Sequence, residues 1–525
     1  MIIEALLAFT LASAMVVFLS PDRYAGKLAT ALSLVPLAGS LLMWVEFAGE
    51  GNALLADGDI AFETTAEWVT FSVEAFEWTL QWHVGVDGIS LPLLVMTTIL
   101  TTLALVSSWT PIDTRTSQFY GLMLFMETAL VGVFVALDFF VWFVFWEAVL
   151  IPMYLLIAVW GGPRRKYAAM KFLVYTNLAS LVMFVGVFAL LFGLGDGIST
   201  LSFPEIAQAI RNGQLGSFAG MEPDLLKLVA FSLLFVGFAV KVPIVPFHTW
   251  LPDAHVEAPT PVSVMLAGVL LKMGTYALLR FNFTMLPDVA RENAEIIAAI
   301  GVISVIYGAM LALAQRDLKR IVAYSSISSM GFVIIGLVAF TPHGLGGATF
   351  QMVSHGLISG LMFMVVGVIY NATHTRMVGD MSGLADRMPW TVGVFVAGAF
   401  AYMGLPLMSG FAGEVLVFIG SFHSEAISAA PLFTAAAMFG IVIVAGYLLW
   451  AMQRTLFGPF ELGTDYEIGR APLHDVAPLG VLLVLIVLLG VQPDVIYEAI
   501  QDAVVPLGEP LAVVPDVLLS GGELR

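Results

Sequence analysis

The fold of this chain is decided by residues 231–280, which read FSLLFVGFAVKVPIVPFHTWLPDAHVEAPTPVSVMLAGVLLKMGTYALLR. Two apolar segments each carry one isolated lysine, Lys241 and Lys272, and five prolines lie between Pro243 and Pro261. Proline removes a backbone N–H donor and interrupts a helix. Irregular backbone survives at membrane depth only inside protein or beside water, and a charged amine near the membrane centre costs roughly 3 kcal/mol. Broken helices with isolated lysines therefore predict an ion or proton path.

The composition is that of a membrane protein. Of 525 residues, 59% are hydrophobic and 11% are charged, with a mean hydropathy of +0.95, whereas soluble domains carry about 25% charged residues. The chain has no cysteine, which excludes disulfides, iron–sulfur clusters and thiol catalysis. The net charge of −18 disfavours nucleic acid as a partner.

About fourteen apolar runs follow one another, each near the length of about 20 residues that spans a bilayer. We therefore predict an all-α polytopic membrane protein with about 14 transmembrane helices. The predicted spans lie near 2–19, 28–46, 90–109, 118–137, 139–160, 168–194, the broken pair within 231–280, 294–314, 319–340, 345–371, 390–421, 431–457 and 475–493. Residues 1–19 lack a basic leading region and a small-residue cleavage site, so they predict a first span rather than a removed signal.

Two polar segments separate these runs. Residues 46–75 hold seven acidic residues and no basic one. We predict an acidic, partly amphipathic loop there, in which Trp68, Trp78 and Trp82 suit a membrane interface. A second polar loop contains the short amphipathic run Phe203–Ile210.

Fourteen of the 21 lysines and arginines gather in alternate loops, and the intervening loops are acidic. They are Arg23, Lys27, Arg115, Arg164, Arg165, Lys166, Lys171, Arg316, Lys319, Arg320, Arg376, Arg387, Arg454 and Arg470. Cytoplasmic loops of membrane proteins are enriched in Lys and Arg. We therefore predict that these loops are cytoplasmic, that the chain lies in the cell (inner) membrane, and that both termini face outward, as an even number of spans requires.

Two halves of the chain carry the same arrangement of spans. Spans four to eight hold a broken helix in fourth place, with Lys241 at the break; spans nine to thirteen also hold one in fourth place, interrupted by GLPLMSGFAGE (Gly404–Glu414). Because five is an odd number, the two repeats are inverted in the membrane, and paired interrupted segments point to a transport site. The predicted units are an N-terminal three-helix segment with an acidic outer loop (1–110), a first five-helix repeat (117–282), a second five-helix repeat (293–458), and a last helix with an acidic tail (459–525).

Three ionisable side chains lie inside or at the break of predicted spans. Glu147, in FFVWFVFWEAVLIPMYLL, is roughly 12 Å into its span by helical rise. Lys272 lies about 11 residues beyond Pro261, again near mid-depth. Burial disfavours an isolated charge, and Lys241 and Lys272 are the cations available to Glu147. A structural ion pair is the alternative, but carboxylates and amines in a span are rarely only structural, so we predict that all three move protons.

Glu414 and His355 complete the primary set of candidates. Glu414 follows the second break, and the structural alternative is that it caps the half-helix beginning near Ser409, since carboxylates favour N-terminal turns. His355 lies in QMVSHGLISG on span eleven, where the alternative is a hydrogen-bonded core histidine. We predict proton-translocating roles for both.

Three further residues are secondary candidates. His248 and His255, in the first break, would either relay protons or tie irregular backbone. Glu127, in LMLFMETALVG, would either relay protons or make hydrogen bonds between helices. The histidines show no metal-ligand spacing such as HExxH, and phosphate-cradling glycine loops are absent. We therefore predict that this chain binds no metal and no cofactor.

Several of these stretches resemble the antiporter-like membrane subunits of respiratory complex I, the NADH:quinone oxidoreductase. The matching motifs are AVKVPIVPFHTWLPDAHVEAPTPVSVMLAGVLLKMGTYALLR, FWEAVLIPMYLLI, RDLKRIVAYSSISSMGF, QMVSHGLISG and GLPLMSGFAGE. The resemblance covers nearly the whole chain and is weakest before residue 85 and after residue 460.

The resemblance implies a fourteen-helix fold with two inverted five-helix repeats, a central hydrophilic axis and one proton-translocating module. The axis positions of the family match Glu147, Lys241, Lys272, His355 and Glu414. The chain departs from the family at Ser329, in SISSMG, where a histidine is common. A relay step at that position would use the Ser329 hydroxyl or bound water.

The resemblance also implies a function. The chain would be an enzyme only as a subunit, of the translocase class and without redox chemistry of its own; NADH or another donor and quinone would react elsewhere in the complex. Protons would reach Lys272 and pass through water and His355 towards Glu414. The Glu147–Lys241 pair would act as a switch, biased by neighbouring membrane subunits, which with the lipid bilayer are the expected partners.

Two other assignments share this pattern. One is a subunit of a multi-subunit Na⁺/H⁺ antiporter. The other is a membrane anchor of a hydrogenase or formate-linked complex, in which the chain would be mainly structural. The identity of the co-purifying subunits would separate the three.

Overall fold

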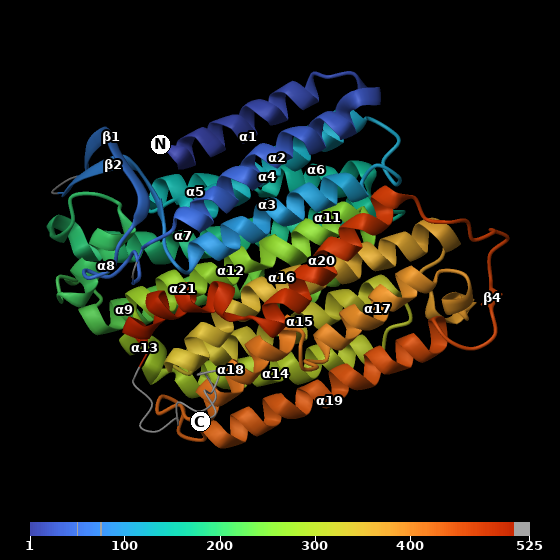
Figure 1. The fold of residues 1–525 in the computed structure, drawn as a ribbon. Helices are drawn as coiled ribbons and strands as arrows, with labels where there is room; N and C mark the ends of the chain where they lie inside the picture. The colour runs from blue at the N-terminus through green and yellow to red at the C-terminus, as the bar shows by residue number, and fades with distance from the viewer. Residues whose placement is uncertain (50, 74–75, 509–525) are drawn as a thin grey trace, which may run out of the picture.

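The computed structural model describes residues 1–49, 51–73 and 76–508; the end of the acidic tail, beyond residue 508, lies outside these residues. Long helices lie side by side and run roughly along one direction (Figure 1). Within the described ranges, twelve helical segments are long and apolar enough to cross a membrane. They are α2 (Asp22–Glu46), α3 (Ser90–Ser107), α4 (Thr116–Val135), α5 (Phe139–Ala148) with α6 (Leu150–Trp160), α7 (Arg165–Leu194), α9 (Pro223–Lys241), the segment Thr260–Met285, α14 (Ala294–Leu313), α15 (Leu318–Val338), α16 (Pro342–Thr373), α19 (Ala430–Thr455) and α20 (Leu473–Val491).

Two shorter apolar elements complete the set of crossings. One is α1 (Ile2–Phe18), and the other is the interrupted pair α17 (Pro389–Tyr402) and α18 (Ser409–Phe422). Twelve segments, α1 and this pair make fourteen crossings in the described part of the chain, so the predicted helical membrane fold is confirmed. The predicted bounds of most spans agree with the observed helices to within a few residues.

The remaining elements are short. They are β1 (Ala61–Val73), β2 (Phe76–Val86), α8 (Phe203–Arg211), α10 (Trp250–Glu257), α11 (Thr260–Met265), α12 (Leu271–Ala277), α13 (Pro287–Glu292), α21 (Asp494–Val504), β3 (Met381–Ser382), β4 (Glu461–Leu462), π-helical turns at Leu266–Leu270 and Leu278–Met285, and 3-10 turns at Gly195–Gly197, Phe247–Thr249, Val378–Asp380, Leu384–Asp386 and Val505–Leu507. The amphipathic run predicted at Phe203–Ile210 is helix α8.

The segment after α2 is a β-hairpin, where the sequence analysis expected a loop. Strands β1 and β2 pair antiparallel, with Thr70 opposite Thr79 and an irregularity between Glu67 and Val69. Trp78 does not lie at an interface: it is 1% exposed and packs against Phe192 of α7. The physical reason is strict alternation of apolar and polar residues in β2, a period of two that places one face of the strand on the protein.

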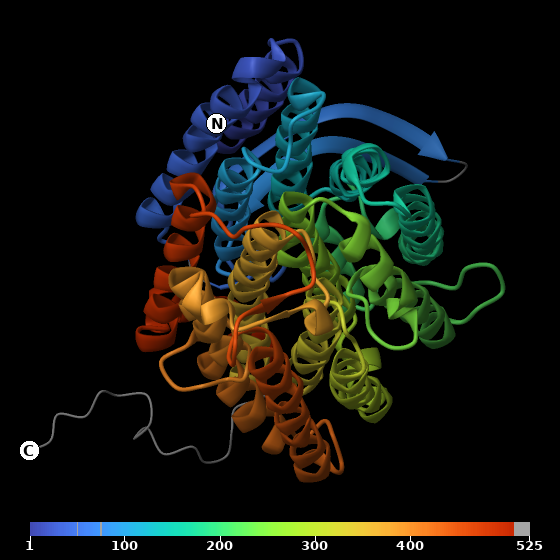
Figure 2. The same cartoon turned by 90° about the vertical axis from the view of Figure 1, so that its right-hand side faces the viewer.

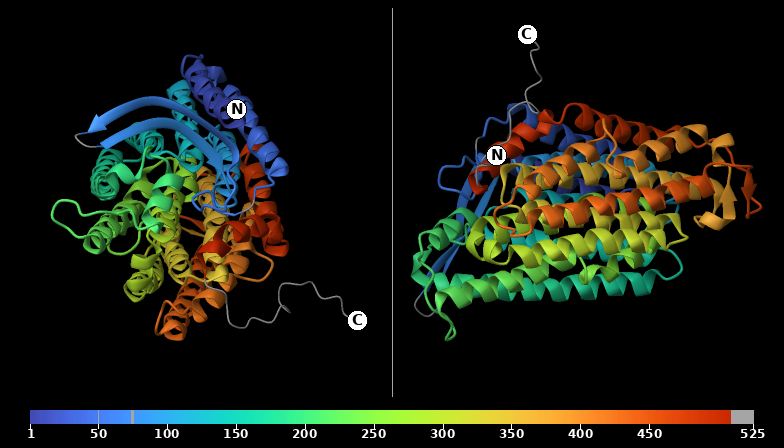
Figure 3. Two further views of the ribbon diagram at one scale, coloured as in Figure 1. Left: turned by 90° about the vertical axis from the view of Figure 1, so that its left-hand side faces the viewer. Right: turned by 90° about the horizontal axis from the view of Figure 1, so that it is seen from below.

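The loops rich in lysine and arginine share one end of the helix bundle, here called the basic end. Figure 2 looks onto this end, where the connections from α6 to α7, from α16 to α17 and from α19 to α20 are seen. Ion pairs tie it together, including Lys171–Asp253 at 2.8 Å and Arg376–Asp317 at 2.6 Å. The opposite end carries the β-hairpin and α8 (Figure 3).

Both repeats contain a helix broken in fourth place. In the first, α9 ends at Lys241 and α10 begins at Trp250; in the second, α17 ends at Tyr402 and α18 begins at Ser409. Pro243 contributes no N–H, and the carbonyl of Ala239 accepts instead from Ile244 N at 3.1 Å. The second break turns at Gly404 and Leu407, both with positive φ. Val242 and Ile244 of the first break are buried, whereas Leu407 of the second break is 64% exposed.

A buried ion pair fastens the segment around the β-hairpin to the eighth crossing. Arg280, in the π-helical turn Leu278–Met285, donates from Nη2 to Oδ1 of Asp87 at 2.5 Å and from Nη1 to Oδ1 of Asn52 at 3.0 Å. The side chains of Arg280 and Asp87 are each 1% exposed. Asp87 also accepts from three backbone N–H groups: those of Ala53, Ile89 and Ser90. The carboxylate therefore organises both the start of α3 and the end of the eighth crossing.

Replacing Asp87 with alanine is expected to destabilise the chain by about 3–5 kcal/mol, the range measured when one partner of a buried pair is removed. The loss arises because Arg280 would keep a buried charge without its counter-ion. The effect is measured as the thermal unfolding temperature of the purified assembly, with aggregation of this chain as the readout. The exposed Asp57→Ala variant is the control and should leave the unfolding temperature unchanged; equal temperatures for both variants would contradict the prediction.

Candidate functional site

Lys241 lies at the last residue of α9, where the first broken helix ends. Its side chain is buried, and its Nζ lies 4.4 Å from the ring centroid of Trp146. Within the described residues, Nζ has no hydrogen-bond partner. Gly274 of α12 explains how the eighth crossing packs so closely on this turn, because a Cβ there would lie 2.8 Å from the backbone nitrogen of Val242. The break thus holds an amine against an aromatic face, a favourable cation–π position.

Glu147 lies where α5 gives way to α6. Pro152 has no N–H to donate to the carbonyl of Ala148, so the helix is interrupted beside the carboxylate. Glu147 is half-buried, and its Oε1 is buried without a hydrogen-bond partner among the described residues. Val144 and Phe140, one and two turns earlier on the helix, are exposed. Glu147 therefore sits between the protein interior and an apolar outer face.

The structure brings Glu147 and Lys241 close but does not join them. Among the described residues, neither the Nζ of Lys241 nor the Oε1 of Glu147 has a partner at hydrogen-bonding distance. The two charges interact across a longer separation. Trp146, the residue before Glu147, provides the surface that Lys241 contacts. The expected pair is thus present as neighbours rather than as a closed ion pair.

Lys272 and His355 are in direct contact at the centre of the molecule. The Nζ of Lys272 lies 2.7 Å from Nδ1 of His355 and donates to the carbonyl of Ala267 at 2.6 Å. Both side chains are buried. The helix that carries Lys272 has π-helical turns on both sides of α12, a distortion frequent at functional sites.

Two glycines allow this contact. A Cβ on Gly356, the residue after His355, would lie 2.9 Å from the carbonyl oxygen of Gly268. Helix α16 and the π-helical turn Leu266–Leu270 therefore touch through their backbones. That close approach positions the imidazole of His355 at the amine of Lys272.

Glu414 lies in α18, just after the second break. It is the sixth residue of that helix, and the first turn of α18 contains no acidic residue, so the capping role considered from the sequence is wrong. The carboxylate packs on Gly404, whose φ is +64° and where a Cβ would collide with Oε2. The irregular turn between α17 and α18 therefore packs directly on the Glu414 carboxylate.

Polar side chains that the sequence analysis missed lie between His355 and Glu414. The rings of His355 and Tyr402 are 5.8 Å apart. The hydroxyl of Tyr447, in α19, interacts electrostatically with Tyr402 and with Glu414. The Oγ of Ser354, in α16, donates a hydrogen bond to the Oγ of Ser409, the first residue of α18, at 2.8 Å. Tyrosines in apolar helices carry no charge signal, and only the place of Tyr402 two residues before Gly404, where GLPLMSG begins, marked it in the sequence.

The secondary candidates are placed unequally. His255 is fully buried in α10, stacks on Phe363 at 4.4 Å, and has no partner on either ring nitrogen among the described residues. His248 lies in the break itself, edge-on to Tyr307 at 5.7 Å. Both carboxylate oxygens of Glu127 are buried without a partner in the described ranges.

Ser329 shares a face of α15 with Ser325 and Ser326. Its side chain is buried, and its hydroxyl makes no hydrogen bond within the part of the chain that the structure describes. Both Ser325 and Ser326 instead donate to the carbonyl of Val322, at 2.7 Å and 3.3 Å. A relay at Ser329 therefore stays a prediction.

Gly404→Ala should displace the Glu414 carboxylate and slow proton movement while leaving the chain assembled. A left-handed conformation costs an L-residue roughly 1–2 kcal/mol, which the membrane fold should tolerate. The measurement is proton uptake by vesicles relative to electron transfer. Gly393→Ala, in α17 and with no atom near its Cβ, is the matched control; equal proton uptake in the two variants would show that the turn does not set the position of Glu414.

The described residues contain no group of three or more His, Cys, Asp or Glu side chains arranged to hold a metal ion. The polar groups of the site are instead strung out along the crossings, from α5 to α18. They include a lysine and a histidine in direct contact and several buried polar atoms without a protein partner. Such atoms are usually completed by internal water.

Comparison with known proteins identifies the family. The sequence model described as "NADH:quinone oxidoreductase/Mrp antiporter, TM" matches residues 136–440. The chain belongs to this family. The matched range contains both broken helices of this chain and all five of its primary candidate residues.

Whole-chain relatives agree with this assignment. The chain is 40% identical over 491 residues to NAD(P)H-quinone oxidoreductase chain 4 3 of Trichormus variabilis, covering 89% of each sequence. Among solved structures, a chain of respiratory complex I from Thermus thermophilus with bound NADH superposes with a TM-score of 0.80 at 25% identity, covering 97% of this family member and 99% of that chain. A chain of the membrane-bound sulfane sulfur reductase, an archaeal respiratory membrane complex, gives a TM-score of 0.77 at 26% identity, with coverages of 93% and 76%.

Proposed function

We propose that this chain is a proton-translocating membrane subunit of a respiratory NADH:quinone oxidoreductase, in the place of chain M. Supporting this are the family, the relative named NAD(P)H-quinone oxidoreductase chain 4, and the match to complex I. The observation that carries the proposal is the buried contact between Lys272 and His355. An amine and an imidazole 2.7 Å apart, shielded from bulk solvent, form a pair between which a proton moves without leaving the protein.

In the proposed route, protons arrive at Lys272, cross to His355 and continue to Glu414. We place Tyr402 and Tyr447 along the second part of this route. Their hydroxyls are buried without a hydrogen-bond partner among the described residues, and a phenol hydroxyl is able both to donate and to accept a hydrogen bond. Water would complete the gaps between these side chains. The route therefore joins the broken helix of the first repeat to that of the second.

The Glu147–Lys241 pair serves as the switch in this proposal. When the carboxylate approaches, the ammonium of Lys241 is stabilised and keeps its proton; when it withdraws, burial favours release of that proton inward. The observed separation fits the open arrangement, with Lys241 resting on Trp146. Because Glu147 borders an exposed apolar face, a neighbouring membrane subunit seated there would bias its position.

This chain would itself bind neither NADH nor quinone nor any other cofactor, and would act as a translocase driven by quinone reduction elsewhere in the complex. Its orientation in the cell membrane would follow the basic end, which faces the cytoplasm under the positive-inside rule. Both termini would then lie on the outer side.

The test is the identity of the assembly that contains this chain and the flux that it drives. Pull-down of the full-length chain from detergent extracts should recover quinone-reductase subunits, and vesicles should couple NADH-driven quinone reduction to proton uptake. Sodium-dependent proton flux without quinone reductase activity would instead assign the chain to a Na⁺/H⁺ antiporter, which the family description also covers. Recovery of sulfur-reductase or hydrogenase subunits would instead place the chain in a related respiratory complex that uses another electron donor.

A further inference from the structure

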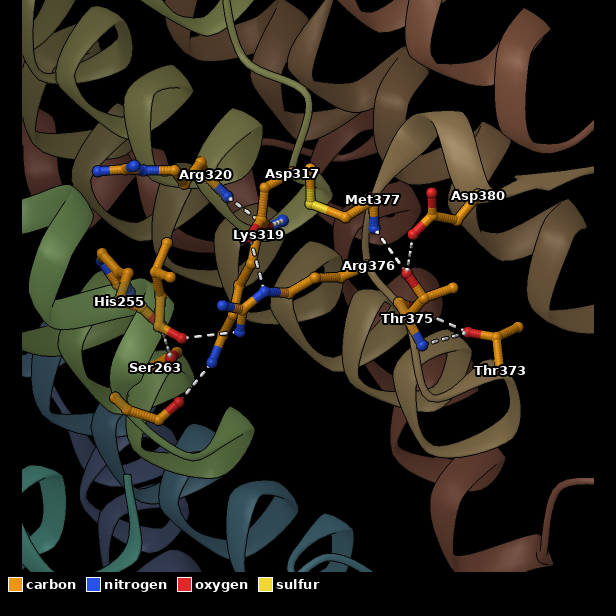
Figure 4. Close-up of polar contacts among 12 residues, drawn as sticks. His255, Ser263, Asp317, Lys319, Arg320, Thr373, Thr375, Arg376, Met377 and Asp380 are labelled. Atoms are coloured by element: carbon orange, nitrogen blue, oxygen red, sulfur yellow. Dashed lines mark hydrogen bonds and ion pairs between the residues drawn. The ribbon is translucent and has the colours of Figure 1, made fainter. Parts of the chain in front are cut away.

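A third buried lysine lies at the basic end, outside the set of candidate site residues described above. Lys319 is the second residue of α15 and is 5% exposed. Its Nζ donates a hydrogen bond to the carbonyl of Ala258, which follows α10 (Figure 4). One carbonyl satisfies only one of the three N–H groups of an ammonium. Among the described residues this carbonyl is the one hydrogen-bond partner of the amine, while Asp317 and Glu257 act on it electrostatically. A buried ammonium with so few hydrogen bonds is costly, so this amine occupies an unusual position for a purely structural contact.

An ion pair covers Lys319 on the side of the basic end. Arg376 donates from Nε to Oδ2 of Asp317 at 2.6 Å and from Nη1 to the carbonyl of Val256 at 2.9 Å. The side chains of Arg376 and Asp317 are 27% and 11% exposed, so both reach the surface. Asp317 also accepts from the backbone N–H of Lys319 at 2.9 Å. Figure 4 shows this partly exposed pair beside the buried amine of Lys319.

His255, in α10, is drawn beside Lys319 in Figure 4 and is the residue that connects Lys319 electrostatically to Lys272. Both lysines interact electrostatically with the His255 imidazole, and His255 in turn interacts with His355. Neither ring nitrogen of His255 has a hydrogen-bond partner among the described residues. Its ring is held by stacking on Phe363, which fixes the plane while leaving both nitrogens free to exchange protons. His255 thus has electrostatic neighbours on two sides, namely Lys319, whose ion-pair cover reaches the surface, and the buried Lys272–His355 contact.

We propose that Lys319 is the inlet station for protons at the basic end, and that it passes them through His255 to Lys272. The neutral imidazole accepts a proton on one nitrogen and releases the proton of the other, so no net charge stays on His255 after the transfer. The Asp317–Arg376 pair closes the inlet and must part for protons to enter. This inference rests on the proposed function, since it supplies protons to the route described above.

The alternative is that Lys319 only clamps the end of α10 through the Ala258 carbonyl. Two substitutions distinguish a clamp from a relay. Lys319→Arg keeps the charge and the donor but holds its proton permanently, and Lys319→Gln keeps a donor without an exchangeable charge. A clamp tolerates at least one of these changes, whereas a relay tolerates neither.

The experiment measures proton uptake and quinone reduction together in the intact assembly. Both Lys319 variants should lose as much proton uptake as Lys272→Met. Lys171→Gln is the matched control, since Lys171 also donates to a backbone carbonyl, that of Thr249 at 2.8 Å, but near the surface of the same end. Proton uptake by either Lys319 variant at the level of this control would overturn the inlet proposal.

A further variant keeps the proposal falsifiable if the Lys319 variants do not assemble. His255→Phe preserves the stack on Phe363 and removes no hydrogen bond, because neither ring nitrogen makes one in the described part of the chain. It should lose proton uptake; full uptake would overturn the inlet. If Lys272→Met also retains full uptake, the proposed function itself fails, and the two failures are thereby distinguished.

Discussion

Lys272→Met is expected to abolish the proton translocation that passes through this chain while the assembly remains intact. Methionine keeps the length of the side chain and its packing between the two π-helical turns, but it removes the amine that contacts His355 at 2.7 Å. Removing a positioned acid–base group slows proton transfer by about 10²–10⁴-fold. Dye-quenching of proton uptake by membrane vesicles, divided by the rate of quinone reduction, measures the loss.

The control for this variant is Lys227→Met, near the start of α9 and away from the break. It removes a positive charge from the same pair of crossings without touching the His355 contact. Its uptake should equal that of the unmodified protein. If Lys227→Met and Lys272→Met lost uptake equally, the effect would follow from charge or assembly rather than from the buried contact.

The second large effect is expected when Glu147 or Lys241 is replaced with alanine. Each change removes one half of the proposed switch, so each should impair proton uptake strongly. Residues that act as one unit give non-additive effects, so the double variant should be little worse than either single variant. The measurement is uptake in the two single variants and the double variant, made in the intact assembly.

The matched control for this set is Glu467→Ala, which removes an exposed carboxylate from the loop before α20. It should pump protons normally. Unimpaired uptake in both Glu147→Ala and Lys241→Ala would reject the switch. Independent, multiplying losses in the double variant would show that the two residues act separately.

The membrane fold was accessible from the sequence because its signals are strong and local. Apolar runs of span length have few competing explanations, and the observed span at Phe139–Trp160 begins and ends where it was predicted. The breaks were also predictable, since Pro243 and the Gly404 turn leave backbone groups that a continuous helix would pair. Charged residues at these breaks then marked the site.

What the sequence did not reveal depends on tertiary contacts. The β-hairpin was not predicted because the acidic composition of the segment favoured a loop. The alternation of Trp78, Leu80 and Trp82 with polar residues indicated a strand. Tyr402 and Tyr447 gained their place only from the packing of α17 and α19 against α18. Lys319 was assigned to the basic loops because the sequence does not show which of two adjacent helix positions is buried. In the structure Lys319 is buried beneath the Asp317–Arg376 ion pair.

The distance between Glu147 and Lys241 was equally beyond the sequence. Both residues were expected at one site, and both are there. Their separation depends on the interruption at Pro152 and on the ring of Trp146, which occupies the position over the Lys241 amine. Rotation of a single helical segment would change it, so the sequence specifies the partners but not the state of the pair.

The central claim is that the buried Lys272–His355 contact belongs to a proton route coupled to quinone reduction. The most direct measurement is the number of protons moved per electron by the purified assembly in liposomes, with Lys272→Met compared against the unmodified protein. The account predicts a lower ratio at an unchanged proton leak, because electrons would still reach quinone while this route is closed. An unchanged ratio in a fully assembled Lys272→Met complex would contradict it.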